Sequence, residues 1–125
     1  MAYRVLIIDD DVDFIESGKV LLENNGYEVI TAFDGQEGVR KALEERPDII
    51  LLDVLMTTED DGFQITHRIK LQAPVPIVIL TSLKKGSEKS KVGVKRVPLE
   101  EYIEKPINPE RLISAIKNIL GNEGQ

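Results

Sequence analysis

The sequence predicts an α/β fold in which helices cover both faces of a doubly wound, five-stranded parallel sheet. Short apolar runs rich in β-branched residues alternate with segments of helical periodicity, β-α five times over. Such alternation implies a parallel sheet, and right-handed crossovers then restrict the topology to a doubly wound one. The 125 residues suit one domain, which we place at residues 1–121, followed by a polar tail at 122–125.

The first half of the chain is expected to hold three strands and two helices. The predicted strands span residues 3–8, 27–31 and 49–52. The first helix follows the triplet Asp9-Asp10-Asp11, with Asp11 at its start, and it stops at Asn25-Gly26, since glycine commonly ends helices. Asp34 is expected to cap the second helix, with Glu37 in capping-box spacing, and Pro47 ends it.

The second half contains two more strands. They span residues 76–80 and 101–104. A polar loop at 57–62 leads into a third helix, which ends before Pro74. Residues 83–98 contain glycines in positions that suit a helix poorly, so we expect a short, shifted or mobile fourth helix there. Pro109 opens the last helix and Gly121 closes it.

Composition excludes several classes of function. Acidic residues outnumber basic ones, 22 to 16, and the net charge of −6 argues against direct nucleic-acid binding through bulk charge. No apolar stretch reaches the roughly 20 residues that a membrane helix needs, so no membrane association is expected. Cysteine is absent, which excludes disulfides and thiolate metal sites. These features together favour a cytoplasmic protein.

Polar side chains follow four of the five predicted strands. The first strand is followed by Asp9 and Asp10, the third by Asp53, the fourth by Thr81 and the fifth by Lys105. In a doubly wound sheet the site lies beyond these strand ends. Three carboxylates would repel one another unless a hard cation such as Mg²⁺ lay between them. A carboxylate can also be a nucleophile, and lysine and threonine suit phosphoryl oxygens, so the set matches phosphoryl transfer to an aspartate.

Short motifs in this order and spacing resemble the receiver domain of two-component response regulators. They are Ile7-Ile8-Asp9-Asp10-Asp11, Leu51-Leu52-Asp53-Val54, Ile79-Leu80-Thr81-Ser82 and Tyr102-Ile103-Glu104-Lys105-Pro106. The resemblance extends from about Tyr3 to Leu120. It implies a flavodoxin-like (βα)5 fold with strand order 2-1-3-4-5. No phosphate-binding glycine loop follows the first strand, which argues against a nucleotide cradle.

The resemblance implies a role for each matching position on the cation side. Asp53 would be the phosphoacceptor. Asp10 would bind Mg²⁺ directly and Asp9 would help through water. The backbone carbonyl of Leu55 would complete the protein ligands.

Three further positions would contact the phosphoryl group or respond to it. Lys105 would contact the group, and the Lys105-Pro106 peptide would be cis, as is common in this family. Thr81 would move to hydrogen-bond the group, and Tyr102 would change rotamer in response. Tyr102 could instead be an ordinary half-buried aromatic.

The function implied is a signalling switch rather than an enzyme, since it would catalyse only its own phosphorylation and dephosphorylation. A sensor histidine kinase, a phosphotransfer protein or a small phosphodonor such as acetyl phosphate would phosphorylate Asp53. The change would pass through Thr81 and Tyr102 to the face of the fourth helix, fifth strand and last helix, where a downstream protein binds. The chain is expected to be a monomer or a weak, phosphorylation-dependent dimer.

Other interpretations stay open. The chain could be a receiver-like interaction module that works without phosphorylation, because its loop at 57–62 lacks the usual proline and is longer than usual. A phosphatase would need a second aspartate where Leu55 stands, and a flavin carrier would need Ser, Thr and Gly where Asp9 to Asp11 stand. The basic run from Lys84 to Arg96 is either a solvated loop or a docking strip for an acidic partner. His67 is expected on the surface.

Overall fold

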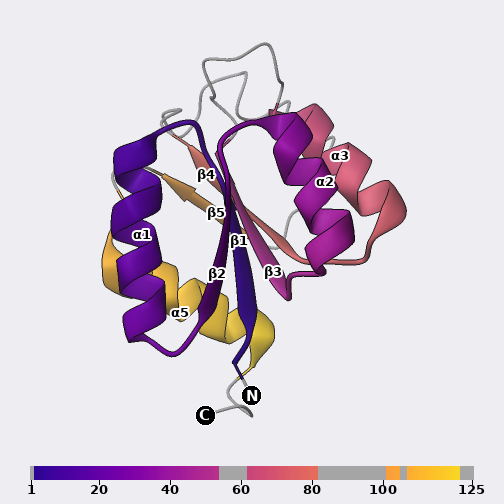
Figure 1. Cartoon of the computed structure of the whole chain (residues 1–125). Coiled ribbons are helices and arrows are strands. Elements are labelled where there is room, and N and C mark those ends of the chain that lie inside the picture. The colour runs from indigo at the N-terminus through magenta and orange to yellow at the C-terminus, as the bar shows by residue number, and fades with distance from the viewer. Residues whose placement is uncertain (1, 54–61, 82–100, 105–106, 122–125) are drawn as a thin grey trace.

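A central parallel sheet lies between two layers of helices in the computed structural model, which describes residues 2–53, 62–81, 101–104 and 107–121 (Figure 1). The chain runs through β1 (Arg4–Ile8), α1 (Val12–Asn24), β2 (Glu28–Ala32), α2 (Gly35–Glu45), β3 (Ile49–Asp53), α3 (Gly62–Gln72), β4 (Ile77–Thr81), β5 (Glu101–Glu104) and α5 (Pro109–Leu120). Helices α1 and α5 cover one face, and α2 and α3 cover the other. Every predicted strand begins and ends within one residue of an observed one.

The strands pair in the order β2-β1-β3-β4-β5, and every pairing is parallel. The predicted parallel sheet and its order 2-1-3-4 are confirmed, and β5 pairs with β4 at the edge. The helix expected within residues 83–98 and the tail at 122–125 lie outside the described residues. No helix in the described part of the chain is long and apolar enough to cross a bilayer.

Strand β1 pairs with β2 on one side and with β3 on the other. Ile8, its last residue, is in register with Ala32 of β2 and Leu52 of β3. The connection after β1 leads to β2 on one side, and the connection after β2 leads back past β1 to β3 on the other, so the strand order reverses between β1 and β3. In open α/β sheets this reversal produces a crevice beyond the carboxyl ends of the two strands.

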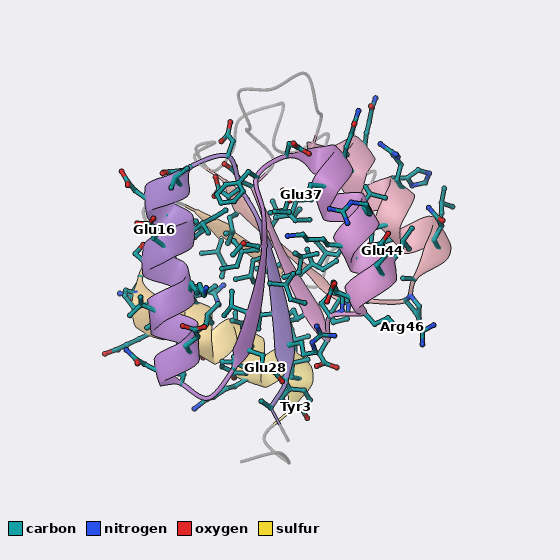
Figure 2. All side chains as sticks on the ribbon, viewed as in Figure 1. Tyr3, Glu16, Glu28, Glu37, Glu44 and Arg46 are labelled. Carbon is teal, nitrogen blue, oxygen red and sulfur yellow. The ribbon has the colours of Figure 1, made fainter. Side chains whose placement is uncertain are left out.

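The core has two halves because alternate side chains of each strand point to opposite faces of the sheet. In β1, Leu6 and Ile8 pack toward α2 and α3, whereas Val5 and Ile7 pack toward α1 and α5. All four are fully buried. Burial on both faces explains why β1, β3 and β4 are nearly continuous apolar runs. Figure 2 shows side chains filling the spaces on both sides of the sheet.

Short polar side chains begin the helices as the sequence predicts. Asp11 caps α1, and its carboxylate accepts a hydrogen bond from the Phe14 N–H at 3.2 Å. In α5, Pro109 follows an Asn108 cap, and Gly121 ends the helix with a φ of 81°. The predicted roles of Asp11, Pro109 and Gly121 are therefore confirmed.

Candidate metal centre at the carboxyl edge of the sheet

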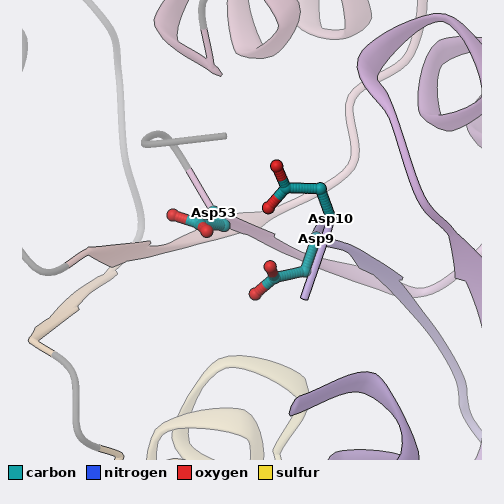
Figure 3. Close-up of side chains that lie close together, drawn as sticks. All are labelled: Asp9, Asp10 and Asp53. Atoms are coloured by element: carbon teal, nitrogen blue, oxygen red, sulfur yellow. The ribbon is translucent and has the colours of Figure 1, made fainter. Parts of the chain in front are cut away.

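Three carboxylates converge at the crevice between β1 and β3 (Figure 3). Asp9 and Asp10 follow β1 directly, and Asp53 is the last residue of β3. One oxygen from each side chain lies within 4.8 Å of the others. Asp9 is fully buried, Asp53 is 5% exposed and Asp10 is partly exposed. The structure thus brings together the three aspartates that the strand ends predict.

The backbone after β1 orients these side chains. The Asp9 N–H donates to the Ala32 carbonyl at 3.0 Å and so extends the pairing of β1 with β2. The Asp9 carboxylate accepts the Asp11 N–H at 2.9 Å. Because Asp11 in turn caps α1, this loop is anchored to both the sheet and the helix.

The donor set fits a hard divalent cation. Two carboxylates at this separation repel each other by roughly 1–3 kcal/mol for effective dielectric constants between ~20 and ~80. Burial of Asp9 and Asp53 places their pair near the stronger end of that range. Mg²⁺ prefers oxygen ligands and usually takes one or two carboxylates together with water and phosphate oxygens. Asp9, Asp10 and Asp53 could therefore hold Mg²⁺ and leave a position for a phosphoryl oxygen.

The backbones of two other predicted site residues belong to the neighbouring strands. Asp53 is in register with Leu80 of β4, so Thr81 lies one position beyond it at the same edge of the sheet. Tyr102 lies in β5 opposite Ile79. Lys105, Pro106, Leu55 and the basic run from Lys84 to Arg96 lie outside the described residues.

Beside the carboxylates, a brace holds the loop after β2, and the sequence predicts it only in part. Glu37 was expected to complete a capping box with Asp34, and Asp34 does accept the Glu37 N–H at 2.8 Å. The Glu37 carboxylate, however, accepts the Phe33 N–H at 2.8 Å. Lys41 lies 3.5 Å from the other Glu37 oxygen and donates to the Thr31 carbonyl at 2.5 Å. The spacing of Glu37 and Lys41, four residues apart on a helix, is the signal for this pair.

The brace also perturbs the acidity of Glu37. The Phe33 N–H stabilises the carboxylate and so lowers the pKa of Glu37, with partial burial opposing this and the Lys41 and Arg40 cations assisting.

Two other side chains complete the comparison with the sequence. His67 is exposed, as predicted, whereas its neighbour Thr66 is fully buried, which the sequence analysis did not anticipate.

Known proteins share both the sequence pattern and the fold. The chain is 34% identical over 120 residues to protein PilH of Pseudomonas aeruginosa, covering 94% of this chain and 97% of PilH. It is 35% identical over 121 residues to the alkaline phosphatase synthesis transcriptional regulatory protein PhoP of Bacillus subtilis. That match covers 96% of this chain and 49% of PhoP, so the chain spans about half the length of this relative.

The likeness extends to solved structures and to a family model. The chemotaxis protein CheY4 of Vibrio cholerae matches with a TM-score of 0.86 and 32% identity, covering 95% of this chain and 99% of that one. A CheY-like receiver domain protein from Methanospirillum hungatei matches with a TM-score of 0.86 and 30% identity, covering 96% and 94% of the two chains. The model of the response regulator receiver domain matches residues 5–117. The chain therefore belongs to the response regulator receiver domain family, whose members are signalling modules of two-component systems.

Proposed function

We propose that this receiver domain is a phosphoacceptor switch in which the Asp53 carboxylate takes up a phosphoryl group in a Mg²⁺-dependent reaction. The convergence of Asp9, Asp10 and Asp53 within 4.8 Å at the reversal of strand order carries the proposal. Asp53 ends the central strand β3 and is 5% exposed, so it lies at the carboxyl edge of the sheet, where a donor would approach.

The transfer itself requires little covalent chemistry from the protein. A carboxylate oxygen of Asp53 forms a P–O bond while the P–N bond of a phosphohistidine breaks. The imidazole leaves with the electron pair and takes its proton from solvent; with acetyl phosphate, acetate leaves instead. Catalysis of such transfers is almost entirely positioning and charge neutralisation. Bound Mg²⁺ supplies that neutralisation.

The surrounding residues divide the remaining work on this proposal. Asp10, which is partly exposed, would bind the cation directly, and the buried Asp9, whose carboxylate accepts the Asp11 N–H, would help through water. The Leu55 carbonyl completes the protein ligands, as the family resemblance implies. Asp9, Asp10 and Asp53 would thus hold the cation together, and Asp53 would also act as the nucleophile.

On this proposal, two further residues contact the phosphoryl group and begin the response. Lys105 pairs with a phosphoryl oxygen, and the Thr81 hydroxyl donates to another. The pairing of β4 with β5 connects Thr81 to the strand that holds Tyr102. Output then passes to the face formed by the helix expected between β4 and β5, by β5 and by α5. A sensor histidine kinase or phosphotransfer protein would be the donor, and a downstream protein the target.

Incubation with acetyl phosphate and Mg²⁺, followed by intact-mass measurement, tests the proposal. The wild-type chain should gain one phosphoryl group, and the gain should vanish in EDTA and in Asp53→Asn. Asp13→Asn is the matched control, because Asp13 is an exposed acid of the first turn of α1 outside the carboxylate cluster, and this variant should react normally. An adduct that persists in Asp53→Asn would contradict the assignment. No adduct in the wild type would instead favour an interaction module that works without phosphorylation.

A further inference from the structure

Strand β2 is an edge of the sheet in the described part of the chain, where its strand partner is β1. Successive residues of a strand direct their backbone groups to opposite sides. Ala32 directs its carbonyl toward β1, where the carbonyl accepts the Asp9 N–H at 3.0 Å. The Thr31 carbonyl and the Phe33 N–H, one residue to either side, therefore face the open edge of the sheet.

Two charged side chains of α2 bind these edge groups in place of a further strand. The Glu37 carboxylate accepts the Phe33 N–H at 2.8 Å, and the Lys41 ammonium donates to the Thr31 carbonyl at 2.5 Å. Glu37 lies in the first turn of α2, and Lys41 follows one turn later (Figure 2 labels Glu37). Their charges meet at 3.5 Å, so the two side chains hold each other as well as the strand.

A single peptide unit joins this ion pair to the carboxylate cluster. The Ala32 carbonyl and the Phe33 N–H belong to the same peptide unit, which is planar and rigid. One side of the unit accepts the Asp9 N–H, and the other side donates to Glu37. A hydrogen bond to an anion polarises a peptide and strengthens the bond that its carbonyl accepts. Glu37 and Lys41 thus restrain the backbone of Asp9 from outside the site.

We propose that Glu37 and Lys41 are positioning residues for the cation site, and that they act on Asp9 through the peptide unit of Ala32 and Phe33. The inference rests on the proposed binding of Mg²⁺ and adds two residues that lie outside the carboxylate cluster. Asp9 is fully buried, so a shift of its backbone moves its carboxylate relative to the other two. Groups that orient metal ligands in this way commonly determine metal affinity.

Arg40 provides a matched control for Lys41. It is the preceding residue of α2 and forms an ion pair with Glu44 at 3.1 Å, but its side chain is 56% exposed, against 25% for Lys41. Arg40→Met and Lys41→Met each remove one positive charge from the same turn. Coulomb's law alone predicts slightly tighter Mg²⁺ binding in both variants. Weaker binding in Lys41→Met would therefore have the opposite sign to a general charge effect.

The first measurement is a Mg²⁺ titration followed by the NMR shifts of backbone amides. Lys41→Met should raise the Kd for Mg²⁺ by roughly threefold to tenfold, at or below the low end of the range for groups that hold a metal ligand directly. Lys41→Arg, which keeps a cationic donor for the Thr31 carbonyl, should restore most of the affinity. Arg40→Met should bind within about twofold of the wild type or more tightly.

A matched pair tests the second positioning residue. Glu37→Gln and Glu37→Ala lose the same charge, but the glutamine oxygen can still accept the Phe33 N–H. Glu37→Ala should therefore bind Mg²⁺ more weakly than Glu37→Gln.

Hydrogen exchange without metal separates positioning from general stability. Exchange of the Asp9 amide should be faster in Lys41→Met and in Glu37→Ala than in the wild type, by a larger factor than exchange of the Leu51 amide, which lies in the buried central strand.

Three results would overturn the inference: an unchanged Kd for Mg²⁺ in Lys41→Met, an equal loss of affinity in Arg40→Met, or equal changes in exchange at Asp9 and Leu51. A wild-type chain that binds no Mg²⁺ would refute the proposed cation site together with this inference. The titration contains no phosphoryl donor, so it tests Glu37 and Lys41 whether or not Asp53 accepts a phosphoryl group.

Discussion

Two buried helical glycines should respond in opposite directions to the same substitution. A Cβ added at Gly38 of α2 would lie 2.6, 2.9 and 3.0 Å from Cδ1, Cγ1 and Cγ2 of Ile8. A Cβ added at Gly18 of α1 would meet only Cδ1 of Ile7, at an ordinary contact distance of 3.5 Å. Gly38 therefore allows α2 to lie directly on β1, whereas Gly18 leaves room for a methyl group.

The expected magnitudes follow from two opposing terms. Replacing glycine with alanine inside a helix stabilises it by about 1 kcal/mol. At Gly38 the added methyl overpacks against Ile8, which is fully buried and stiff because it is β-branched. Overpacking costs about 1–3 kcal/mol, and three contacts at or below 3.0 Å place this case in the upper half. Gly38→Ala should therefore lose about 1–2 kcal/mol, and Gly18→Ala should gain up to about 1 kcal/mol.

Urea unfolding followed by circular dichroism measures both changes. With an m-value of about 1–3 kcal/mol/M, the midpoint should fall by on the order of 1 M in Gly38→Ala and rise slightly in Gly18→Ala. Ile8→Val removes the Cδ1 atom nearest the new methyl, so combining it with Gly38→Ala should lose about 1 kcal/mol less than the sum of the single changes. Equal midpoints for Gly38→Ala and Gly18→Ala would refute the reasoning, as would strict additivity with Ile8→Val.

Three further predictions concern charges. Arg4→Ala removes hydrogen bonds to the Glu45 carbonyl and carboxylate at the end of α2, and urea unfolding should show a loss of about 0.5–1 kcal/mol because the pair is partly exposed. The Phe33 N–H lowers the pKa of Glu37 below its ordinary 4.5, so its stabilisation is complete above pH 4.5 and is lost as the pH falls through the lower folded value. Glu37→Gln should accordingly have a lower free energy of unfolding than the wild type at neutral pH. Its stability should also fall less steeply than that of the wild type as the pH is lowered through the acid range. In EDTA, Asp53→Asn should be more stable to urea than the wild type by roughly 1–3 kcal/mol, since it relieves repulsion with the other two carboxylates. Mg²⁺ should stabilise the wild type more than the variant. An unchanged midpoint in EDTA would argue against that repulsion.

Most of the fold could be predicted because its signals are local. Strands β1, β3 and β4 are short, mostly apolar runs, and each described helix except α3 begins at a cap or proline that the sequence displays. The buried face of α1 is harder to place from the sequence, because Ile15 and Leu22 are buried in the core whereas the neighbouring Phe14 and Leu21 are only partly buried. A helix period alone places a face only within about a residue, and the neighbouring α5 decides which side is buried.

The carboxylate cluster could be predicted for a related reason. Parallel strands end at one edge of a sheet, so the residues that follow β1 and β3 must meet once the strand order is known. Details that depend on a partner distant in sequence could not be predicted. The tight contact of Gly38 with Ile8 and the choice of Phe33 rather than Asp34 as the donor to Glu37 both depend on how closely α2 approaches β1 and β2.

The sequence by itself determined the order of elements, the doubly wound sheet and the identity of the aspartates at the strand ends, because periodicity, caps and chain direction are properties of neighbouring residues. Tertiary structure alone decided the 4.8 Å convergence of Asp9, Asp10 and Asp53 and their differing burial. It also decided the hydrogen bond from the Phe33 N–H to the Glu37 carboxylate. These features depend on the distances between elements. Side-chain packing across the whole core sets those distances, and no local pattern encodes them.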